Sequence, residues 1–385
     1  MAVSESTPEE STPAPARASL FVHVPFCDVR CPYCHFTFFV NRDPELPERW
    51  ARAIRREFEQ LVATRPGLTI PSVYFGGGTP SALDPMARER VCDWLAGPVR
   101  ERLEPDAEVT IEVNPESAWP ETLRPWVDAG VNRMSLGVQS QDEEVLRFLG
   151  RLNTSRSNLR ALDLACSMVE NVSADLIVAS PPDRWDRLHR SLEAIASRPI
   201  SHVSAYLLEI HDSTRFGRDV KAGRWSPSPD ESQVHLYLKM AEWLQSRGFA
   251  AYELSNFAQP GRASRHNQRY WTREAYLGLG PSASSFEGDR RWTNEPDTRT
   301  WCAGVAAVGT AIVEEERLDW RAVRRERILL GLRTAGGIPL AWIEGRDALC
   351  RELLGAGLLE ADQGQVRCTV EGWLLLDQIV AQLVD

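Results

Sequence analysis

Between Leu20 and about residue 255, short apolar runs alternate with longer amphipathic segments. The runs are rich in β-branched and aromatic residues and predict strands at Leu20–Val24, Val73–Phe75, Val109–Val113, Arg133–Val138, Ala174–Val178 and Val203–Leu207. Helical spacing of apolar residues predicts helices at Pro47–Val62, Pro85–Leu95, Glu143–Leu149, Ser157–Val169 and Asp186–Ala196. This alternation predicts an α/β fold, a partial (β/α)6 barrel of parallel strands with its chemistry at their C-terminal ends.

Beyond residue 300 the pattern changes to helix, helix, hairpin, helix. The segments are Arg321–Leu332, Leu340–Leu354, the pair Leu358–Glu360 and Val366–Cys368, and a last helix capped by Thr369. This order is that of a winged-helix-like α+β module. We therefore expect a barrel unit at 19–300 and a C-terminal module at 301–385, and the few basic residues on the wing favour a packing or lid role over DNA binding.

The charge balance narrows the classes of partner. The 385 residues include 44 Lys and Arg against 54 Asp and Glu, so the net charge is 44 − 54 = −10, which argues against a nucleic-acid partner. Residues 1–18 are rich in Ser, Thr, Pro, Glu and Ala and predict a disordered tail without a signal peptide. No stretch approaches the ~18 consecutive apolar residues of a membrane span. We expect a cytoplasmic protein.

Three cysteines follow the first predicted strand at C-x3-C-x2-C spacing: Cys27, Cys31 and Cys34. Three thiolates on one metal centre are one ligand short of a closed zinc site or a fully ligated iron–sulfur cluster. In a four-iron cluster, the missing ligand leaves one iron open to a small molecule. A zinc site completed by His35 is the alternative. The other five cysteines show no motif spacing and are expected to be small core residues.

Further candidate residues fall at or near the ends of the later strands. The loop Gly76–Pro80 (GGGTP) allows close approach of a ligand and is expected to leave its N–H groups free, a tight turn being the alternative. Glu112 places a carboxylate at a strand tip, where it could accept hydrogen bonds from a ribose or an amino group. Gln139 ends the fourth strand, with Arg151 twelve residues further on. Asp175 lies inside the fifth strand and requires a partner or a ligand once buried.

An aromatic segment from Tyr252 to Phe286 contains His266, Tyr270 and Trp271 in the run HNQRYW. A loop of this composition could bind a planar ligand by stacking and axial ligation. The residues alone favour another reading, in which the loop caps the open edge of the barrel and His266 is satisfied by a backbone hydrogen bond.

The cysteine motif, the GGGTP loop and the run GVNRMSLGVQS (130–140) together resemble the radical S-adenosylmethionine superfamily. Within it, the chain is similar to the branch of oxygen-independent coproporphyrinogen III dehydrogenases and HemW-type haem chaperones. The resemblance implies a [4Fe–4S] cluster on the three cysteines, with S-adenosylmethionine on its open iron. For S-adenosylmethionine, the resemblance implies that Tyr33 packs by the adenine, that Gly77, Gly78 and Thr79 meet the methionyl end, and that Glu112 binds the same cofactor. Three further residues match positions that contact a second S-adenosylmethionine in the dehydrogenase: Gln139, Arg151 and Asp175.

Two features favour the chaperone branch. The first is that the ordered chain is expected to begin almost at the first predicted strand, Leu20–Val24, whereas the dehydrogenase carries a longer N-terminal extension. The second is the HNxxYW segment (His266, Tyr270, Trp271), which is associated with haem binding in the chaperones. The implied partners are haem, a haem-acceptor protein and a reductant such as flavodoxin or ferredoxin. A coproporphyrinogen III dehydrogenase, or a radical methyltransferase or cyclase, is the alternative. The chain departs from the family at Phe21, Asn153 and Ser284, which replace Tyr, His and His, and at Ala179–Pro182, which replaces a glycine-rich loop.

Overall fold

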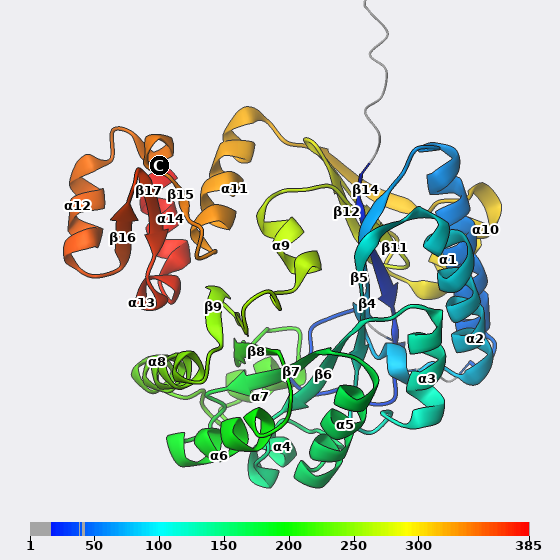
Figure 1. The fold of residues 1–385 in the computed structure, drawn as a ribbon, viewed down its shortest axis with the longest axis horizontal. Coiled ribbons are helices and arrows are strands. Elements are labelled where there is room, and N and C mark those ends of the chain that lie inside the picture. The colour runs from blue at the N-terminus through cyan, green and yellow to red at the C-terminus, as the bar shows by residue number, and fades with distance from the viewer. Residues whose placement is uncertain (1–16, 38, 41–42, 385) are drawn as a thin grey trace, which may run out of the picture.

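A computed structural model describes residues 17–384 except 38, 41 and 42. Its body is one twelve-stranded sheet with strand order β14-β13-β12-β11-β1-β4-β5-β6-β7-β8-β10-β9 (Figure 1). The central strands are β1 (Ser19–Val24), β4 (Ile70–Gly77), β5 (Leu103–Val113), β6 (Arg133–Gln139), β7 (Asn171–Val178) and β8 (His202–Leu207). These six are parallel to one another, as the alternating pattern predicts.

The barrel is open. On the far side of β1 lies β11 (Tyr276–Leu279), and on the far side of β8 lies β10 (Asn256–Ala258), which pairs in turn with β9 (Ala250–Glu253). The first and sixth strands of the parallel set therefore do not meet, and the prediction of a partial rather than a closed barrel is confirmed.

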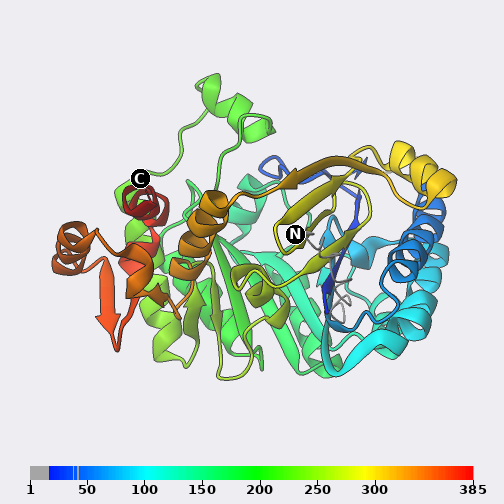
Figure 2. The ribbon, with the colours of Figure 1, turned by 90° about the horizontal axis from the view of Figure 1, so that it is seen from above.

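Helices pack on the outer, apolar face of the parallel strands (Figure 1). They are α1 (Leu46–Ala63), α2 (Pro85–Trp94), α3 (Pro120–Ala129), α5 (Ser155–Met168), α6 (Trp185–Ala196) and α8 (Asp230–Ser246). The short helices α4 (Glu143–Phe148) and α7 (Arg215–Lys221) share a separate small hydrophobic cluster, and α7 projects from the body in Figure 2. The sequence pattern did not predict α3, because Pro125 interrupts its helical signal. Its buried Leu123 and Trp126 nevertheless face the core, and Gly130 ends it at φ +118°.

An antiparallel extension continues the sheet beyond β11. It consists of β12 (Ser284–Glu287), β13 (Arg290–Asn294) and β14 (Ile312–Arg317), with α10 (Thr298–Val308) between the last two. The strand β14 lies beyond the expected boundary at residue 300 and still belongs to this sheet. The buried carboxyl of Glu57 in α1 holds the extension by accepting bonds from Gly280 N (2.9 Å) and Asn294 Nδ2 (2.8 Å).

The C-terminal residues form a module with its own hydrophobic core, beside the sheet body (Figures 1 and 2). Its elements are α11 (Trp320–Leu332), β15 (Ile338–Pro339), η4 (Leu340–Ile343), α12 (Asp347–Gly355), β16 (Leu359–Asp362), β17 (Gln365–Cys368), α13 (Val370–Trp373) and α14 (Leu376–Val384). The expected winged-helix-like order is present. However, the helix expected at Leu340–Leu354 is broken where Gly345 adopts φ +85°.

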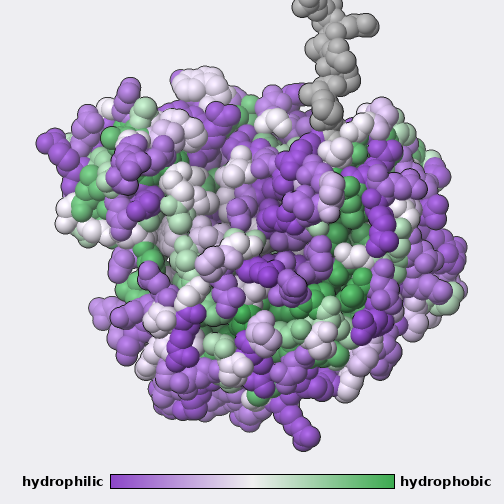
Figure 3. Space-filling model, viewed as in Figure 1, coloured by the Kyte–Doolittle hydropathy of each residue, from purple (hydrophilic) through white to green (hydrophobic). Residues whose placement is uncertain are grey.

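The expected tail lies mostly outside the described residues. Its last two residues contact the sheet body, since Arg17 Nε donates to Glu104 (2.6 Å) and Ala18 is buried. Across the described residues, none of the helices has the length and apolar character needed to cross a membrane. The face seen in Figure 3 is mostly hydrophilic, with apolar residues confined to a few places on the sheet body and the C-terminal module.

Candidate functional site

A cavity of about 540 Å³ begins beside the cysteine loop, at the C-terminal ends of the parallel strands, and continues into the barrel. It brings together the cysteines and every residue expected at S-adenosylmethionine: Cys27, Cys31, Cys34, Tyr33, Gly77, Gly78, Thr79, Glu112, Gln139, Arg151 and Asp175. The three residues expected at haem, His266, Tyr270 and Trp271, are not among its lining residues.

The cysteine loop leaves β2 (Phe26–Cys27), which pairs with β3 (Phe39–Val40). A backbone bond from Cys34 N to Cys31 O (3.1 Å) turns the loop, and Cys27 Sγ lies 3.4 Å from Thr79 Oγ1. Burial raises the pKa of the Cys27 thiol to about 12 and also raises that of Cys34. These thiols therefore need a cationic centre to hold them as thiolates.

The donor set favours a cluster over a single ion. The ring of His35 packs against that of His211, with 3.8 Å between centroids, rather than completing a tetrahedron with the cysteines. Three partly exposed thiols around one cavity, with no fourth cysteine beside them, fit a cluster with one open iron.

The glycine loop after β4 holds the site together through its own backbone. Gly78 N donates to Val24 O (2.9 Å) and Thr79 N donates to Phe26 O (2.7 Å), while Gly77 N donates to Glu112 Oε2 (3.0 Å). The expectation that these N–H groups are free is therefore wrong. A Cβ on Gly78 would lie 2.5 Å from Val24 O, so glycine is required for β1 and the cysteine loop to approach.

Glu112 is buried at the centre of the cavity wall. It accepts hydrogen bonds from the Tyr74 hydroxyl (2.9 Å) and from Gly77 N (3.0 Å). Burial raises the pKa of Glu112 to about 7, with a further contribution from Asp175, while the two hydrogen bonds act in the opposite direction. A cationic ligand would favour the ionised carboxylate.

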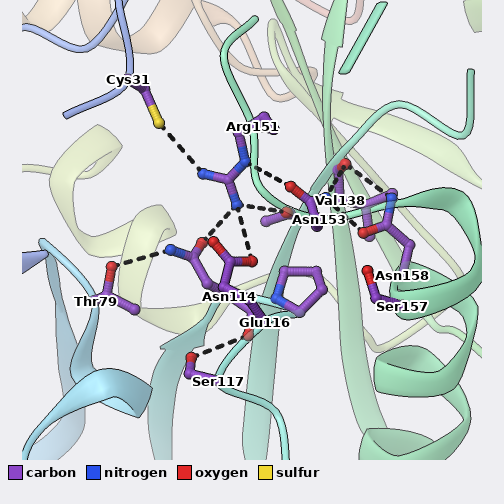
Figure 4. Close-up of polar contacts among 12 residues, drawn as sticks. Cys31, Thr79, Asn114, Glu116, Ser117, Val138, Arg151, Asn153, Ser157 and Asn158 are labelled. Carbon is purple, nitrogen blue, oxygen red and sulfur yellow. Dashed lines mark hydrogen bonds and ion pairs between the residues drawn. The ribbon is translucent and has the colours of Figure 1, made fainter. Parts of the chain in front are cut away.

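Arg151 connects the cysteine loop to the strand ends (Figure 4). Its guanidinium donates to Asn114 Oδ1 (2.9 Å) and Asn153 Oδ1 (2.9 Å), and Nη1 lies 3.6 Å from Cys31 Sγ. The Arg151 side chain is only 7% exposed, and this burial alone would lower its pKa. Its interactions with Tyr33 and Cys31 act in the opposite direction, and the pKa of Arg151 is raised overall. Asn153, one of the departures from the family pattern named above, thus orients this arginine.

Gln139 combines an unusual backbone conformation with an unpaired side-chain oxygen, two features expected of a ligand-binding residue. It ends β6 with φ +58°, a conformation that non-glycine residues rarely adopt. Its Oε1 atom is buried and has no hydrogen-bond partner among residues 17–384 as described. An unpaired buried acceptor on the wall of a cavity fits a ligand with N–H or O–H donors.

Asp175 finds the partners that its burial requires. Ser135 Oγ lies 2.9 Å from both carboxyl oxygens, and Ser173 Oγ donates at 3.1 Å. Burial raises the pKa of Asp175, and the bonds from Ser204 and the other two serines oppose that rise. The Asp175 carboxyl group is therefore surrounded by neutral serine hydroxyls and lies at the wall of the cavity.

His266 lies on a helix, α9 (Arg265–Trp271), and not in the loop that the sequence predicted. Ser264 caps this helix, and its first N–H groups also bond the distant Glu108 carboxylate, whose position the local sequence does not reveal. The ring of His266 bonds two side chains rather than the backbone: Nδ1 to Ser72 Oγ (2.9 Å) and Nε2 to the Tyr270 hydroxyl (2.8 Å).

The other two aromatic residues of this segment are also engaged. Burial raises the pKa of the Tyr270 hydroxyl, and the guanidinium of Arg333 lies 4.3 Å from the centroid of the Trp271 ring. Of the remaining departures, Ser284 bonds Thr293 on β13 (3.1 Å), and Phe21 stacks beside Tyr74.

The cavity contains residues that the motifs did not indicate, namely Tyr74, Asn114, Arg133, His202 and Arg333. A signal for some of them is present in the sequence. Successive inward positions on a strand are two residues apart, so Gln139 at the cavity wall places Gly137, Ser135 and Arg133 on the same face. Arg333 comes from the C-terminal module and carries no comparable signal.

Comparison with known proteins gives one consistent result. A family model described as the Radical SAM superfamily matches residues 21–195. The chain is 36% identical to a heme chaperone HemW of Mycobacterium tuberculosis, over 95% of this chain and 94% of that protein. It is 33% identical to a mitochondrial radical S-adenosyl methionine domain-containing protein 1 of Danio rerio, over 95% and 87%.

Among solved structures, the coproporphyrinogen III oxidase HemN of Escherichia coli superposes with a TM-score of 0.83. The superposition covers 96% of this chain and 91% of that one at 22% sequence identity, which shows a shared fold. The likeness includes the C-terminal module, so the sheet body and the module recur together.

Proposed function

The chain belongs to the HemW branch of the radical S-adenosylmethionine superfamily, and from this premise we propose that it binds haem and passes it to an acceptor protein. The observation that carries the proposal is the 36% identity to a heme chaperone over 95% of the chain. Membership of the superfamily implies a [4Fe–4S] cluster and S-adenosylmethionine, and the cavity residues fit both.

We assign the cluster to Cys27, Cys31 and Cys34. When bound and reduced, the cluster and S-adenosylmethionine together would supply radical chemistry, which belongs to the cofactors rather than to the chain. The chain contributes binding and orientation: Glu112 offers a carboxylate to a cationic ligand, and Gln139 offers a free acceptor. Arg151 places a positive charge beside the cysteine sulfur.

The same cavity wall includes Tyr33, whose ring packs 6.4 Å from that of Phe216 and supplies an apolar face. We propose that this face receives the adenine, with Gly77, Gly78 and Thr79 near the methionyl end. Asp175 and the serines that bond it would then lie further along the cavity wall from the cysteines. A reductant such as flavodoxin or ferredoxin would supply the electron.

For haem we propose α9 as the binding element, with His266 as the axial ligand and Tyr270 and Trp271 beside it. In the present conformation, both ring nitrogens of His266 are bonded. Ligation therefore requires the bond from Nε2 to the Tyr270 hydroxyl to break. That bond contributes on the order of 1 kcal/mol. Because His266 is only 1% exposed, the ring must also become accessible before haem can bind it.

A pair of variants tests this ligand. Haem titration followed by absorbance should show stoichiometric uptake by the unmodified protein and loss of uptake in His266→Ala. Tyr270→Phe frees Nε2 and should tighten haem binding roughly 3- to 10-fold, because the competing bond is gone. Unchanged haem affinity in both variants would exclude His266 as the ligand. The haem-binding site would then have to lie elsewhere on the protein.

An enzyme is the second candidate, because the cysteines, Glu112 and Asp175 share one continuous cavity. A coproporphyrinogen III dehydrogenase would produce 5′-deoxyadenosine in proportion to that substrate under anaerobic, reducing conditions. A radical methyltransferase or cyclase would do so with another substrate. Absence of the nucleoside with coproporphyrinogen III would count against the dehydrogenase.

A further inference from the structure

The deep end of the cavity contains a buried arginine that makes no ion pair with any described carboxylate. Arg133 begins β6, roughly 20 Å along the strand from Gln139 at the cysteine end. It is 2% exposed and lines the cavity. Its one side-chain hydrogen bond within the described residues goes from Nη1 to Arg262 O (3.2 Å), and no described carboxylate lies within ion-pair distance of it.

The titratable groups around Arg133 do not balance its charge. The ring of His202 is bonded through both nitrogens, to Ser173 Oγ (2.8 Å) and the Tyr252 hydroxyl (2.8 Å), and burial keeps it neutral by lowering its pKa. Glu108 is committed to the first turn of α9. Asp175 is bonded by serines and makes no direct contact with Arg133, although the charge of the arginine lowers the pKa of that carboxyl. A buried guanidinium with no carboxylate in direct contact is costly unless an anion completes it.

A second arginine enters the cavity from the C-terminal module. Arg333 follows α11, lines the cavity, and pairs through Nε with the fully buried Glu253 (2.9 Å). It also donates from Nη2 to Ser255 Oγ (3.4 Å), a weak bond that a better acceptor can replace. Ser264 and Asn267 add a hydroxyl and an amide to this part of the wall.

We propose that this deep end is a carboxylate-binding subsite, in which Arg133, assisted by Arg333 and Asn267, receives a carboxylate of the ligand in the barrel. Arginine matches carboxylate in both charge and geometry, and the low polarity around it strengthens the pairing. The carboxylate has two possible sources, a propionate of haem or the methionyl carboxylate of a second S-adenosylmethionine, distinct from the one at the cysteines. The first source rests on the proposed haem-binding function, whereas the second does not.

The experiment compares ligands with and without the carboxylate. The cluster-reconstituted protein is titrated anaerobically with haem and with haem dimethyl ester, and S-adenosylmethionine stoichiometry is measured by equilibrium dialysis. If haem is the source, the ester binds about 10- to 100-fold more weakly than haem, and Arg133→Gln lowers haem affinity to that of the ester. If a second S-adenosylmethionine is the source, haem and ester bind alike, and Arg133→Gln loses one equivalent of S-adenosylmethionine while retaining the one at the cysteines.

Arg133→Lys keeps the charge and should retain part of the affinity. Arg65→Gln, which removes a partly buried arginine paired with Glu287 outside the cavity, should change neither titration. The comparison of haem with its ester needs no variant and remains decisive if Arg133→Gln fails to fold. Equal binding of haem and ester, together with unchanged S-adenosylmethionine stoichiometry in Arg133→Gln, overturns the subsite. Failure of haem to bind at all contradicts the proposed function, and the dialysis still tests the subsite.

Discussion

Arg151 Nη1 lies 3.6 Å from Cys31 Sγ, so a buried positive charge touches the cysteine that the sequence assigns to the cluster (Figure 4). The same guanidinium is fixed by Asn114 and Asn153. A side chain held at so many points cannot move away from the sulfur without breaking several bonds. This contact links the cysteine end of the cavity to the ends of the parallel strands.

Removing this charge should alter the cluster more than the fold. Arg151→Gln should lower the reduction potential by on the order of 50 mV, equivalent to about 1 kcal/mol per electron, because reduction adds negative charge next to the lost cation. A redox titration followed by electron paramagnetic resonance measures the shift. Arg65→Gln is the matched control and should leave the potential unchanged. An unaltered potential in Arg151→Gln would show that the contact has no influence on the cluster.

The assignment of the three cysteines predicts a clear difference in metal content. After anaerobic reconstitution, the unmodified protein should hold about four irons and four sulfides, and Cys31→Ala should lose most of both. Cys92→Ala, which changes a buried cysteine outside the cavity, should retain them. About one zinc with no iron or sulfide would instead support the zinc alternative.

Glu112 predicts a pH dependence of cofactor binding. Its pKa is raised to about 7, so the carboxylate that attracts a cationic ligand is mostly protonated at pH 6 and mostly ionised at pH 8. S-adenosylmethionine should therefore bind about tenfold more tightly at pH 8 than at pH 6, as calorimetry can measure. Glu112→Gln should bind weakly at both values, and an equally steep pH dependence in that variant would assign the titration to another group.

The ion pair between Arg333 and Glu253 predicts a large effect on stability. Glu253 is 0% exposed, so Arg333→Met leaves a buried carboxylate without its partner and should lower the free energy of unfolding by about 3 kcal/mol. The double variant with Glu253→Met should recover part of this loss, because it removes the orphaned charge as well. Urea unfolding measures both, and strictly additive losses would show that the two side chains are not coupled.

The sequence predicted the parallel core well, because each of its strands is a local run of β-formers followed by an amphipathic helix. The antiparallel extension was not predicted. Its outer strand β14 has the sequence IVEEER and is exposed along its length, so neither apolar alternation nor burial marks it. Its position depends on pairing with β13, which is a non-local contact.

The candidate site was predicted where its motifs are local and missed where its partners are distant. The cysteines and the GGGTP loop are recognisable from their spacing in the sequence, and the structure brings them to one cavity. The first turn of α9 is also bonded by Glu108, which lies more than 150 residues earlier in the chain. Arg333 reaches the cavity only because the C-terminal module packs beside the barrel, a relationship that no local pattern encodes.

The most direct test of the central claim is a parallel assay on the anaerobically reconstituted protein. One sample is titrated with haem, and a second is incubated with reductant and S-adenosylmethionine, with and without coproporphyrinogen III, and assayed for 5′-deoxyadenosine. The chaperone account predicts saturable, stoichiometric haem uptake and no increase of the nucleoside with coproporphyrinogen III. Absence of haem uptake, together with nucleoside formation that depends on coproporphyrinogen III, would contradict it.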